Sequence, residues 1–277
     1  MDLNTISDIA FPETRDEVWP LLDGDAVMAG GTWLMSEPQV HLLRLIDLNG
    51  LGWEPYVIRD EGLQLGATCT IETISGLSRS DALLDNWCAA PLLHQCCTAL
   101  LQSFKIWKTA TIGGNLSLAF PAGAMVSLAA GLDGVVTIWT GDGGEYQSSV
   151  IDFVTGPAEN IMGTHDVLRS VLFPAAAMRS RTAYRKIALS PLGRSGAVIL
   201  GRRYTDADGG GLTLTVSGAT DRPHDLPFGD VPTQAELDRA LDERIPPQSW
   251  YTDCHGAADW RRAVTGVLAH EIREELA

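Results

Sequence analysis

The sequence is poor in positive charge, and this excludes two classes of partner. Of its 277 residues only 20 are Lys or Arg, against 35 Asp or Glu, so the formal net charge is −15. A nucleic-acid-binding face needs clustered basic residues. An anionic membrane surface attracts the same kind of patch. We therefore expect neither nucleic acid nor an acidic membrane to be a partner.

The sequence also lacks long apolar runs. None approaches the roughly 18 residues that a transmembrane helix requires. The opening Met1-Asp2-Leu3-Asn4 has no basic region leading into an apolar stretch, so it does not resemble a signal peptide. We expect no membrane span and a cytoplasmic location.

Cysteine pairs are absent as well. The count is five, which is odd, and no Cys-x-x-Cys motif occurs. We therefore expect no disulfide framework, and no zinc or iron–sulfur cluster held by this chain alone. Cys96 and Cys97 lie in the apolar segment 92–101 and are predicted to be buried thiols. Asp253-Cys254-His255 is predicted to be a loop before the last helix.

Several common catalytic and nucleotide-binding motifs are missing. The chain has no Gly-x-Gly-x-x-Gly after a strand, no Walker loop and no recognisable hydrolase nucleophile motif. A Rossmann dinucleotide domain, a P-loop nucleoside triphosphatase and a serine or cysteine hydrolase are therefore disfavoured.

Two glycine-rich segments stand out, and both are predicted to be loops: Ala29-Gly30-Gly31-Thr32 and Thr111-Ile112-Gly113-Gly114-Asn115. Adjacent glycines let a backbone approach a ligand closely and direct successive N–H groups at one point. Such a nest of amides suits phosphate. Two of them, each followed by a polar side chain, predict a diphosphate held between two lobes.

Lysine is scarce, yet two of the three lysines directly precede the second glycine segment. These are Lys105 and Lys108; the third is Lys186. They could support binding of an anion or form a solvated helix end. Backbone amides could hold a diphosphate without them, so both interpretations remain open.

Hydrophobic patterning predicts three units, residues 1–52, 53–175 and 176–277. The first contains a short helix from a Thr14-x-x-Glu17 capping box to about Leu22, and strands at 26–29 and 43–48. The second contains a hairpin at 56–65, helices at 71–77, 92–101 and 122–130, and strands at 135–139 and 167–173. A boundary is expected near 174–180.

The third unit is predicted to hold strands at 183–188, 197–204 and 212–217, then two helices. A Thr233-x-x-Glu236 capping box begins the first helix. In the last helix Trp260, Val264, Leu268, Ile272 and Leu276 are four residues apart on one face. This stripe is either core packing or a subunit contact.

The glycine segments belong to a larger pattern that resembles one family. Its segments are Ala29–Thr32, Ser103-Phe104-Lys105-Ile106, Ala110–Asn115, Phe120-Pro121-Ala122-Gly123 and Ala183-Tyr184-Arg185-Lys186. They resemble the FAD-binding, medium subunit of molybdenum hydroxylases, the relatives of carbon monoxide dehydrogenase and bacterial xanthine dehydrogenase. The resemblance implies an α+β fold of the vanillyl-alcohol-oxidase/PCMH type. Two FAD-binding subdomains, 1–52 and 53–175, would precede a small α+β C-terminal domain, 176–277.

Because no Cys or His lies next to either glycine segment in a pattern typical of a flavin tether, we expect FAD to be bound without a covalent bond. The resemblance also implies which residues hold it. These are Met28, Ala29, Gly30, Gly31, Thr32, Trp33, Leu34, Ala110, Thr111, Gly114, Asn115, Leu168, Arg185 and Lys186. Backbone amides of the first segment, the Thr32 hydroxyl and the polar groups of the second would bind diphosphate or ribityl oxygens. Leu168 would lie near the flavin, with Arg185 or Lys186 close to the ring or diphosphate. Two departures stand out: Trp33, where the family often has Asp or Ser, and Ala124, where it commonly has Asp.

The implied function is electron transfer within an oxidoreductase complex. A large molybdopterin-binding subunit would hydroxylate a substrate, and a small subunit with two [2Fe–2S] clusters would pass electrons to FAD and on to an external acceptor. A dimer of such heterotrimers is expected, with no catalytic acid or base and no metal in this chain. The alternatives are a stand-alone flavin oxidase, which would need its own substrate pocket and base, and a non-enzymatic assembly subunit with a decayed FAD site.

Overall fold

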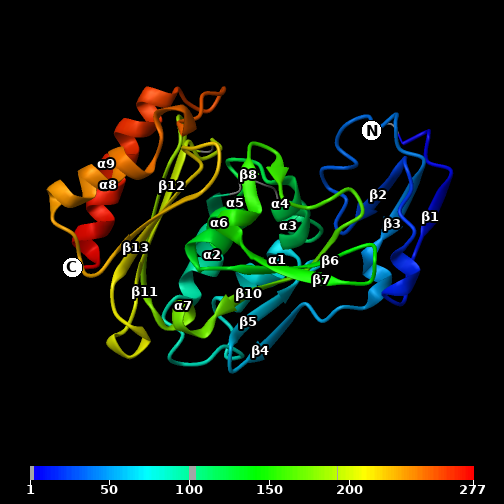
Figure 1. The fold of residues 1–277 in the computed structure, drawn as a ribbon, viewed down its shortest axis with the longest axis horizontal. Helices are drawn as coiled ribbons and strands as arrows, with labels where there is room; N and C mark the ends of the chain where they lie inside the picture. The colour runs from blue at the N-terminus through cyan, green and yellow to red at the C-terminus, as the bar shows by residue number, and fades with distance from the viewer. Residues whose placement is uncertain (1–2, 100–103, 192) are drawn as a thin grey trace.

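The computed structural model describes residues 3–99, 104–191 and 193–277. Its three main sheets follow one another along the longest axis of the molecule, from the blue N-terminal sheet to the yellow and red C-terminal unit (Figure 1). No described helix is both long enough and apolar enough to cross a bilayer.

The N-terminal sheet consists of β1 (Asp8–Ala10), β2 (Asp25–Met28) and β3 (Arg44–Asp47), in the order β1-β3-β2. All pairings are parallel. Leu45 and Ile46 of β3 are buried: Leu45 clusters with Met28 and Leu42, and Ile46 clusters with Val18 and with Val167 of the central unit. The sheet ends at Met28, directly before the first glycine segment, and so fixes where that segment begins.

The predicted capping-box helix from Thr14 to Leu22 is wrong. Only a short 3₁₀ helix forms, η1 (Asp16–Val18), and its N-cap residue makes no side-chain cap bond. The Glu17 carboxylate instead accepts from the Glu13 N–H (2.8 Å). Trp19 is already extended (φ −106°, ψ 156°), because the residue before a proline, here Pro20, is disfavoured in the helical region.

The central sheet is antiparallel, in the order β4-β5-β10-β6-β7. Its strands are β4 (Tyr56–Arg59), β5 (Gly62–Gly66), β6 (Val135–Trp139), β7 (Glu145–Ser149) and β10 (Val167–Pro174). The hairpin predicted at 56–65 is therefore confirmed. β8 (Val154–Gly156) and β9 (Glu159–Asn160) form a separate two-stranded hairpin.

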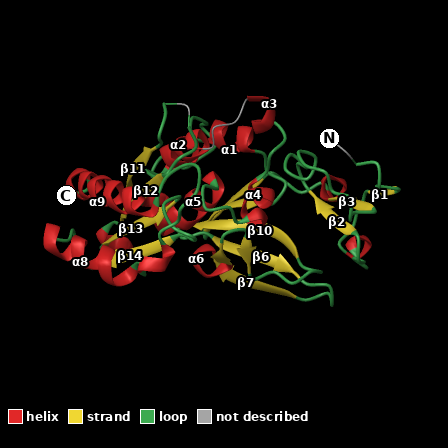
Figure 2. Cartoon of the chain, turned by 90° about the horizontal axis from the view of Figure 1, so that it is seen from above, coloured by secondary structure: helices red, strands yellow, loops and turns green. Residues whose placement is uncertain are grey.

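Helices cover one side of this sheet (Figure 2). They are α1 (Ile71–Leu77), α2 (Ala90–Ala99), α4 (Ile112–Leu118) and α5 (Ala124–Gly131), with α3 (Phe104–Trp107) and α6 (Val150–Phe153) as single turns. Cys96 and Cys97 of α2 are fully buried, as predicted. The end of the helix predicted at 92–101, and Ser103, lie outside the described residues.

The second glycine segment is not a loop, which corrects the expectation from the sequence. It is the first turn of α4, and Thr111 is its N-cap: the Gly114 N–H donates to Thr111 Oγ1 (3.1 Å). Threonine is a good N-cap, and Ile112 and Leu116 bury the helix face. Gly31 has a positive φ of 65°, whereas Gly113 and Gly114 have ordinary helical backbones.

The C-terminal unit follows the short helix α7 (Ala175–Arg179). Its antiparallel sheet runs β11 (Arg181–Ile187), β12 (Ala197–Arg203), β13 (Leu212–Ser217) and β14 (His224–Phe228). Helices α8 (Gln234–Arg244) and α9 (Ala258–Glu275) pack on it, and the Thr233/Glu236 capping box is confirmed. Leu268 and Ile272 of α9 and Leu276 at its C-cap are buried in this core, and Val264 packs against it, so the apolar stripe is core packing.

Candidate cofactor site

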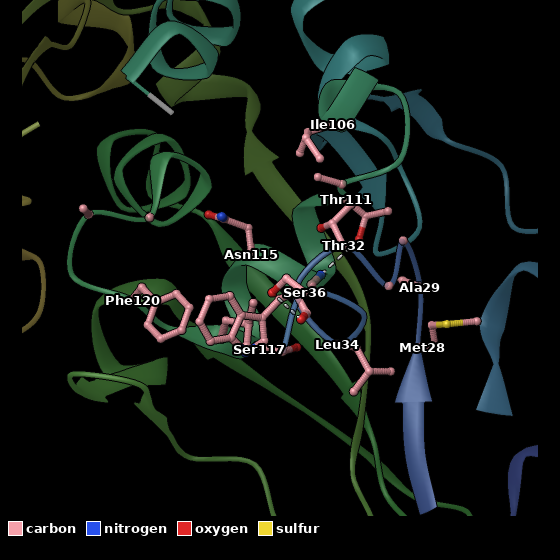
Figure 3. Close-up of a pocket in the computed structure, with 18 of the residues that line it drawn as sticks. Met28, Ala29, Thr32, Leu34, Ser36, Ile106, Thr111, Asn115, Ser117 and Phe120 are labelled. Carbon is pink, nitrogen blue, oxygen red and sulfur yellow. Dashed lines mark hydrogen bonds between the residues drawn. The ribbon is translucent and has the colours of Figure 1, made fainter. Parts of the chain in front are cut away.

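A cavity of about 430 Å³ lies between the N-terminal unit and the helices of the central unit. Its size is within the usual range for ligand pockets. The lining residues are 27–34, Ser36, Ala99, Ile106, Ala110, Thr111, Gly114, Asn115, Ser117, Leu118, Phe120, Ala122, Gly123 and Arg194. Figure 3 shows Thr32 of the first glycine segment, with Leu34 and Ser36 just after it, around this cavity. It also shows Thr111 and Asn115 of the second segment, with Ser117 just after it.

The first glycine segment is shaped by close packing of two backbones. A Cβ on Gly30 would lie 1.8 Å from the Thr109 carbonyl oxygen, so only glycine allows the two segments to touch there. Gly31 takes the left-handed conformation that favours glycine. In the described structure the N–H groups of residues 30–34 have no protein acceptor. This segment therefore offers a row of free amides beside the cavity.

The second segment contributes in a different way, and the interpretation of it as an amide nest is wrong. The N–H groups of Ile112 and Gly113 donate to the carbonyls of Cys69 and Ala67, and those of Gly114 and Asn115 donate to Thr111. All four amides are therefore used inside the protein. This segment can therefore contact a ligand only through its side chains, and it leaves open space beside Gly114.

Two neutral donors face the cavity from this segment. The Asn115 Oδ1 accepts from the Met125 N–H at the start of α5 (2.9 Å), which leaves the two N–H bonds of Nδ2 for a ligand. The Thr111 Oγ1 accepts from Gly114 and keeps its own proton to donate. Both side chains are thus fixed by the fold while a donor remains available.

The two glycines of this segment have different neighbours. A Cβ on Gly113 would lie 2.5 Å from the Ala67 Cβ and 2.6 Å from its carbonyl oxygen, so Gly113 is required for packing of α4 on the end of β5. A Cβ on Gly114 would meet only Thr111 Oγ1, at 3.2 Å. The rest of its surroundings is the cavity, so Gly114 keeps a space that a ligand could fill.

An aromatic pair forms part of the cavity wall. Trp33 packs edge-to-face on Phe120, with ring centroids 4.9 Å apart and planes at 72°. The pair joins the N-terminal unit to the turn that precedes α5. Ala124, the other departure from the family pattern, is fully buried as the first residue of α5 and is not among the lining residues.

Most of the residues expected at the cofactor line this one cavity. They are Met28, Ala29, Gly30, Gly31, Thr32, Trp33, Leu34, Ala110, Thr111, Gly114 and Asn115. Leu168 is buried at a bulge of β10 and lines a neighbouring cavity of about 310 Å³. The two cavities share Val27, Ala29, Gly114 and Ser117, so they adjoin at the glycine segments.

Arg185 and Lys186 line neither cavity. The Arg185 guanidinium pairs with Glu271 (2.9 Å) and Glu275 (2.7 Å) of α9. The Lys186 ammonium donates to the Thr98 carbonyl in the last turn of α2 (2.6 Å), where the helix dipole favours a cation. Burial lowers the pKa of Lys186. In this structure both cations therefore hold elements of the protein together.

The sequence interpretation missed several lining residues. Ser117 lies one turn after Gly114 on α4, so it would have been found had this helix been predicted. Arg194 lies beyond β11, about 80 residues from the second glycine segment, and no local pattern marks it. Lys105 and Lys108 are exposed and do not line the cavity.

The fold and the site define a class of protein: an α+β chain with a ligand-sized cavity between two units, lined by free amides and neutral donors. The family described as the FAD-binding domain in molybdopterin dehydrogenase matches residues 7–176, more than half of the chain. The chain belongs to this family. Comparison with curated protein sequences gives no match.

Solved structures agree on the fold. Quinoline 2-oxidoreductase from Pseudomonas putida 86 superimposes with a TM-score of 0.78 at 19% identity, over 100% of this chain and 98% of its own. Carbon monoxide dehydrogenase from Hydrogenophaga pseudoflava gives 0.78 at 18% identity, over 98% and 97%. The reconstituted enzyme from Oligotropha carboxidovorans gives 0.72 at 20% identity, over 92% and 91%.

These comparisons confirm the recognised family and the fold class. Molybdopterin dehydrogenases are oxidoreductases, so the chain is a flavoprotein component of an oxidoreductase, with FAD as its cofactor. The free amides of the first glycine segment and the donors of Thr111 and Asn115 fit the phosphates of such a cofactor. The open position above Gly114 leaves room for it.

Proposed function

We propose that the chain is the FAD-binding electron-transfer subunit of a multi-subunit molybdopterin-dependent hydroxylase or dehydrogenase. The observation that carries the proposal is the cavity between the first two units, formed by both glycine segments in a chain of this family. Bound there, FAD would collect electrons from the [2Fe–2S] clusters of a partner subunit and deliver them to an external acceptor.

In this proposal the protein's own groups bind and orient the cofactor. The amides of residues 30–34 and the Thr32 hydroxyl would bind the diphosphate. Thr111 and Asn115 would donate from the second glycine segment, which the tight contact of Gly30 with Thr109 holds beside the first. Leu168 would lie beside the flavin, whereas Arg185 and Lys186, which bind α9 and α2, are not part of the proposed site.

The composition of the cavity favours electron transfer over a stand-alone flavin oxidase. The described residues that line the larger cavity include no His, Cys, Asp, Glu or Lys that could act as a general base. In the neighbouring cavity, where Leu168 lies, Asp25 is paired with Arg44, and Asp166 accepts hydrogen bonds from Tyr146 and Gly163. An oxidase acting alone would need such a group beside its substrate. The substrate chemistry is therefore assigned to a partner.

The assembly-subunit alternative, in which the FAD site has decayed, is also disfavoured. Ala124 removes a carboxylate that relatives commonly have, yet the donors around the cavity and the space above Gly114 are intact. Loss of one contact would weaken binding of the cofactor and leave the site itself in place.

We propose the partners on the same basis. A large subunit with molybdopterin and a small subunit with two [2Fe–2S] clusters would form a heterotrimer with this chain, and two heterotrimers would associate in the cytoplasm. Units 1–52, 53–175 and 176–277 would be the two FAD-binding subdomains and the C-terminal domain.

Isolation of the intact complex tests this function. The chain should co-purify with two further subunits, and the preparation should contain about one Mo and four Fe per FAD. Precipitation with acid should release the flavin into the supernatant, because we expect no covalent bond. A chain that elutes alone and reduces its own flavin with a small substrate, without molybdenum, would establish the oxidase instead. A chain that binds no FAD would support the decayed site.

A further inference from the structure

The cavity contains one charged residue that no motif or family pattern on this chain identifies. Of the described lining residues, all are neutral except Arg194. Among the described residues it is also the one that the C-terminal unit contributes to the lining, since the others belong to segments 27–36 and 99–123. The cavity therefore has its cation supplied by a third unit.

Arg194 is available for a ligand. No carboxylate of the described residues lies within 4.0 Å of its guanidinium, and no hydrogen bond of its side chain is found there. Its side chain is exposed at the edge of the cavity.

The backbone beside Arg194 is anchored. The Ser195 hydroxyl donates to the Ala99 carbonyl (3.4 Å), and Ala99 is itself a lining residue. The Gly196 N–H donates to the Ile187 carbonyl (2.8 Å), and a Cβ on Gly196 would lie 2.5 Å from the Trp260 ring. These contacts hold the base of the Arg194 side chain beside the cavity while its guanidinium stays free.

We propose that Arg194 binds the diphosphate of the cofactor and is the residue through which the C-terminal unit contributes to the FAD site. This inference rests on the proposed function. A guanidinium presents several donors in a plane and matches phosphate oxygens in a bidentate way. It complements the neutral donors of Thr111 and Asn115, which carry no charge to balance the diphosphate.

The test measures affinity of the full-length chain for three probes: FAD, ADP, which has the diphosphate without the flavin, and riboflavin, which has the flavin without phosphate. Arg194→Ala should lower the affinity for FAD and for ADP by about tenfold. This loss lies between the contribution of an exposed ion pair and that of a hydrogen bond to a charged group. Riboflavin affinity should not change. Arg194→Lys should recover part of the loss, because the charge returns without the bidentate geometry.

Arg239→Ala is the matched control. Arg239 is an exposed residue of α8 in the same unit and is not a lining residue, so this variant removes the same charge away from the cavity. It should bind all three probes like the wild type. Raising the salt concentration should reduce the affinity of the wild type for FAD more than that of Arg194→Ala.

The outcomes separate the inference from the function beneath it. If the wild type binds FAD and Arg194→Ala binds it equally well, Arg194 has no role at the diphosphate. If Arg194→Ala loses riboflavin as strongly as FAD, the residue acts on the flavin or on the fold, and the inference is wrong. If the wild type binds neither FAD nor ADP, the proposed cofactor site itself fails.

Discussion

Gly113 and Gly114 offer a sharp test, because the same substitution is predicted to reduce stability at Gly113 and FAD affinity at Gly114. We consider the same change, glycine to alanine, at each position. At Gly114 the new methyl group would enter the cavity and touch only Thr111 Oγ1, at 3.2 Å. At Gly113 it would lie 2.5 Å from the Ala67 Cβ, a distance at which the backbone must shift.

The magnitudes follow from these contacts. Alanine is favoured over glycine inside a helix by about 0.5–1 kcal/mol, so Gly114→Ala should leave the free energy of unfolding within about 1 kcal/mol of the wild type. Its methyl group should keep a bound cofactor away from α4. The hydrogen bonds to charged phosphate that are then lost contribute about 1.5–3 kcal/mol, so FAD affinity should fall by roughly tenfold to hundredfold. Gly113→Ala should instead destabilise the fold by about 1–3 kcal/mol through overpacking.

The assay combines denaturant unfolding of the apoprotein with FAD titration followed by flavin fluorescence. Gly114→Ala should unfold like the wild type and bind FAD weakly, and Gly113→Ala should unfold at lower denaturant. Wild-type FAD affinity in a folded Gly114→Ala variant would show that the cofactor does not occupy this cavity. Wild-type stability of Gly113→Ala would refute the packing argument.

Three further changes test other parts of the structure. Asn115→Asp keeps the oxygen that accepts from the Met125 N–H but replaces the Nδ2 donor with a negative charge. The free energy of unfolding should change little, and titration should show FAD affinity at least about tenfold lower; unchanged affinity would remove Asn115 from the site. Burial raises the pKa of the Asp225 carboxyl to about 6 in the folded protein, whereas the same carboxyl has a pKa of about 4 in the unfolded chain. The free energy of unfolding therefore decreases as the pH rises from about 4 to about 6, because the folded protein must release a proton that the unfolded chain has already lost. Asp225→Asn should therefore be more stable than the wild type above pH 6, by up to about 3 kcal/mol, with a gain that disappears toward pH 4; a gain independent of pH in urea unfolding would contradict this. Lys186→Met should lower the melting temperature, because the Thr98 carbonyl loses its cationic donor, and leave FAD affinity unchanged; weaker FAD binding at unchanged stability would return Lys186 to the cofactor site.

The elements that the sequence predicted well are those with strong local signals. The hairpin at 56–65 has a turn between alternating residues, and the Thr233/Glu236 capping box begins α8 as expected. The stripe of α9 was predicted from its spacing, and its burial then decided between core and interface. By contrast β1, β7 and β14 were missed, because short strands with exposed or polar residues depend on their sheet neighbours.

The sequence by itself determined the family and most of the cavity wall. The glycine segments are local, and eleven of the fourteen expected cofactor residues line one cavity. The structure decided what each residue does there. The amides of residues 112–115 are used inside the protein, and Arg185 and Lys186 bind α9 and α2 while Arg194 reaches the cavity. These assignments depend on which distant segments supply acceptors and carboxylates, and only the packed chain brings those groups within bonding distance.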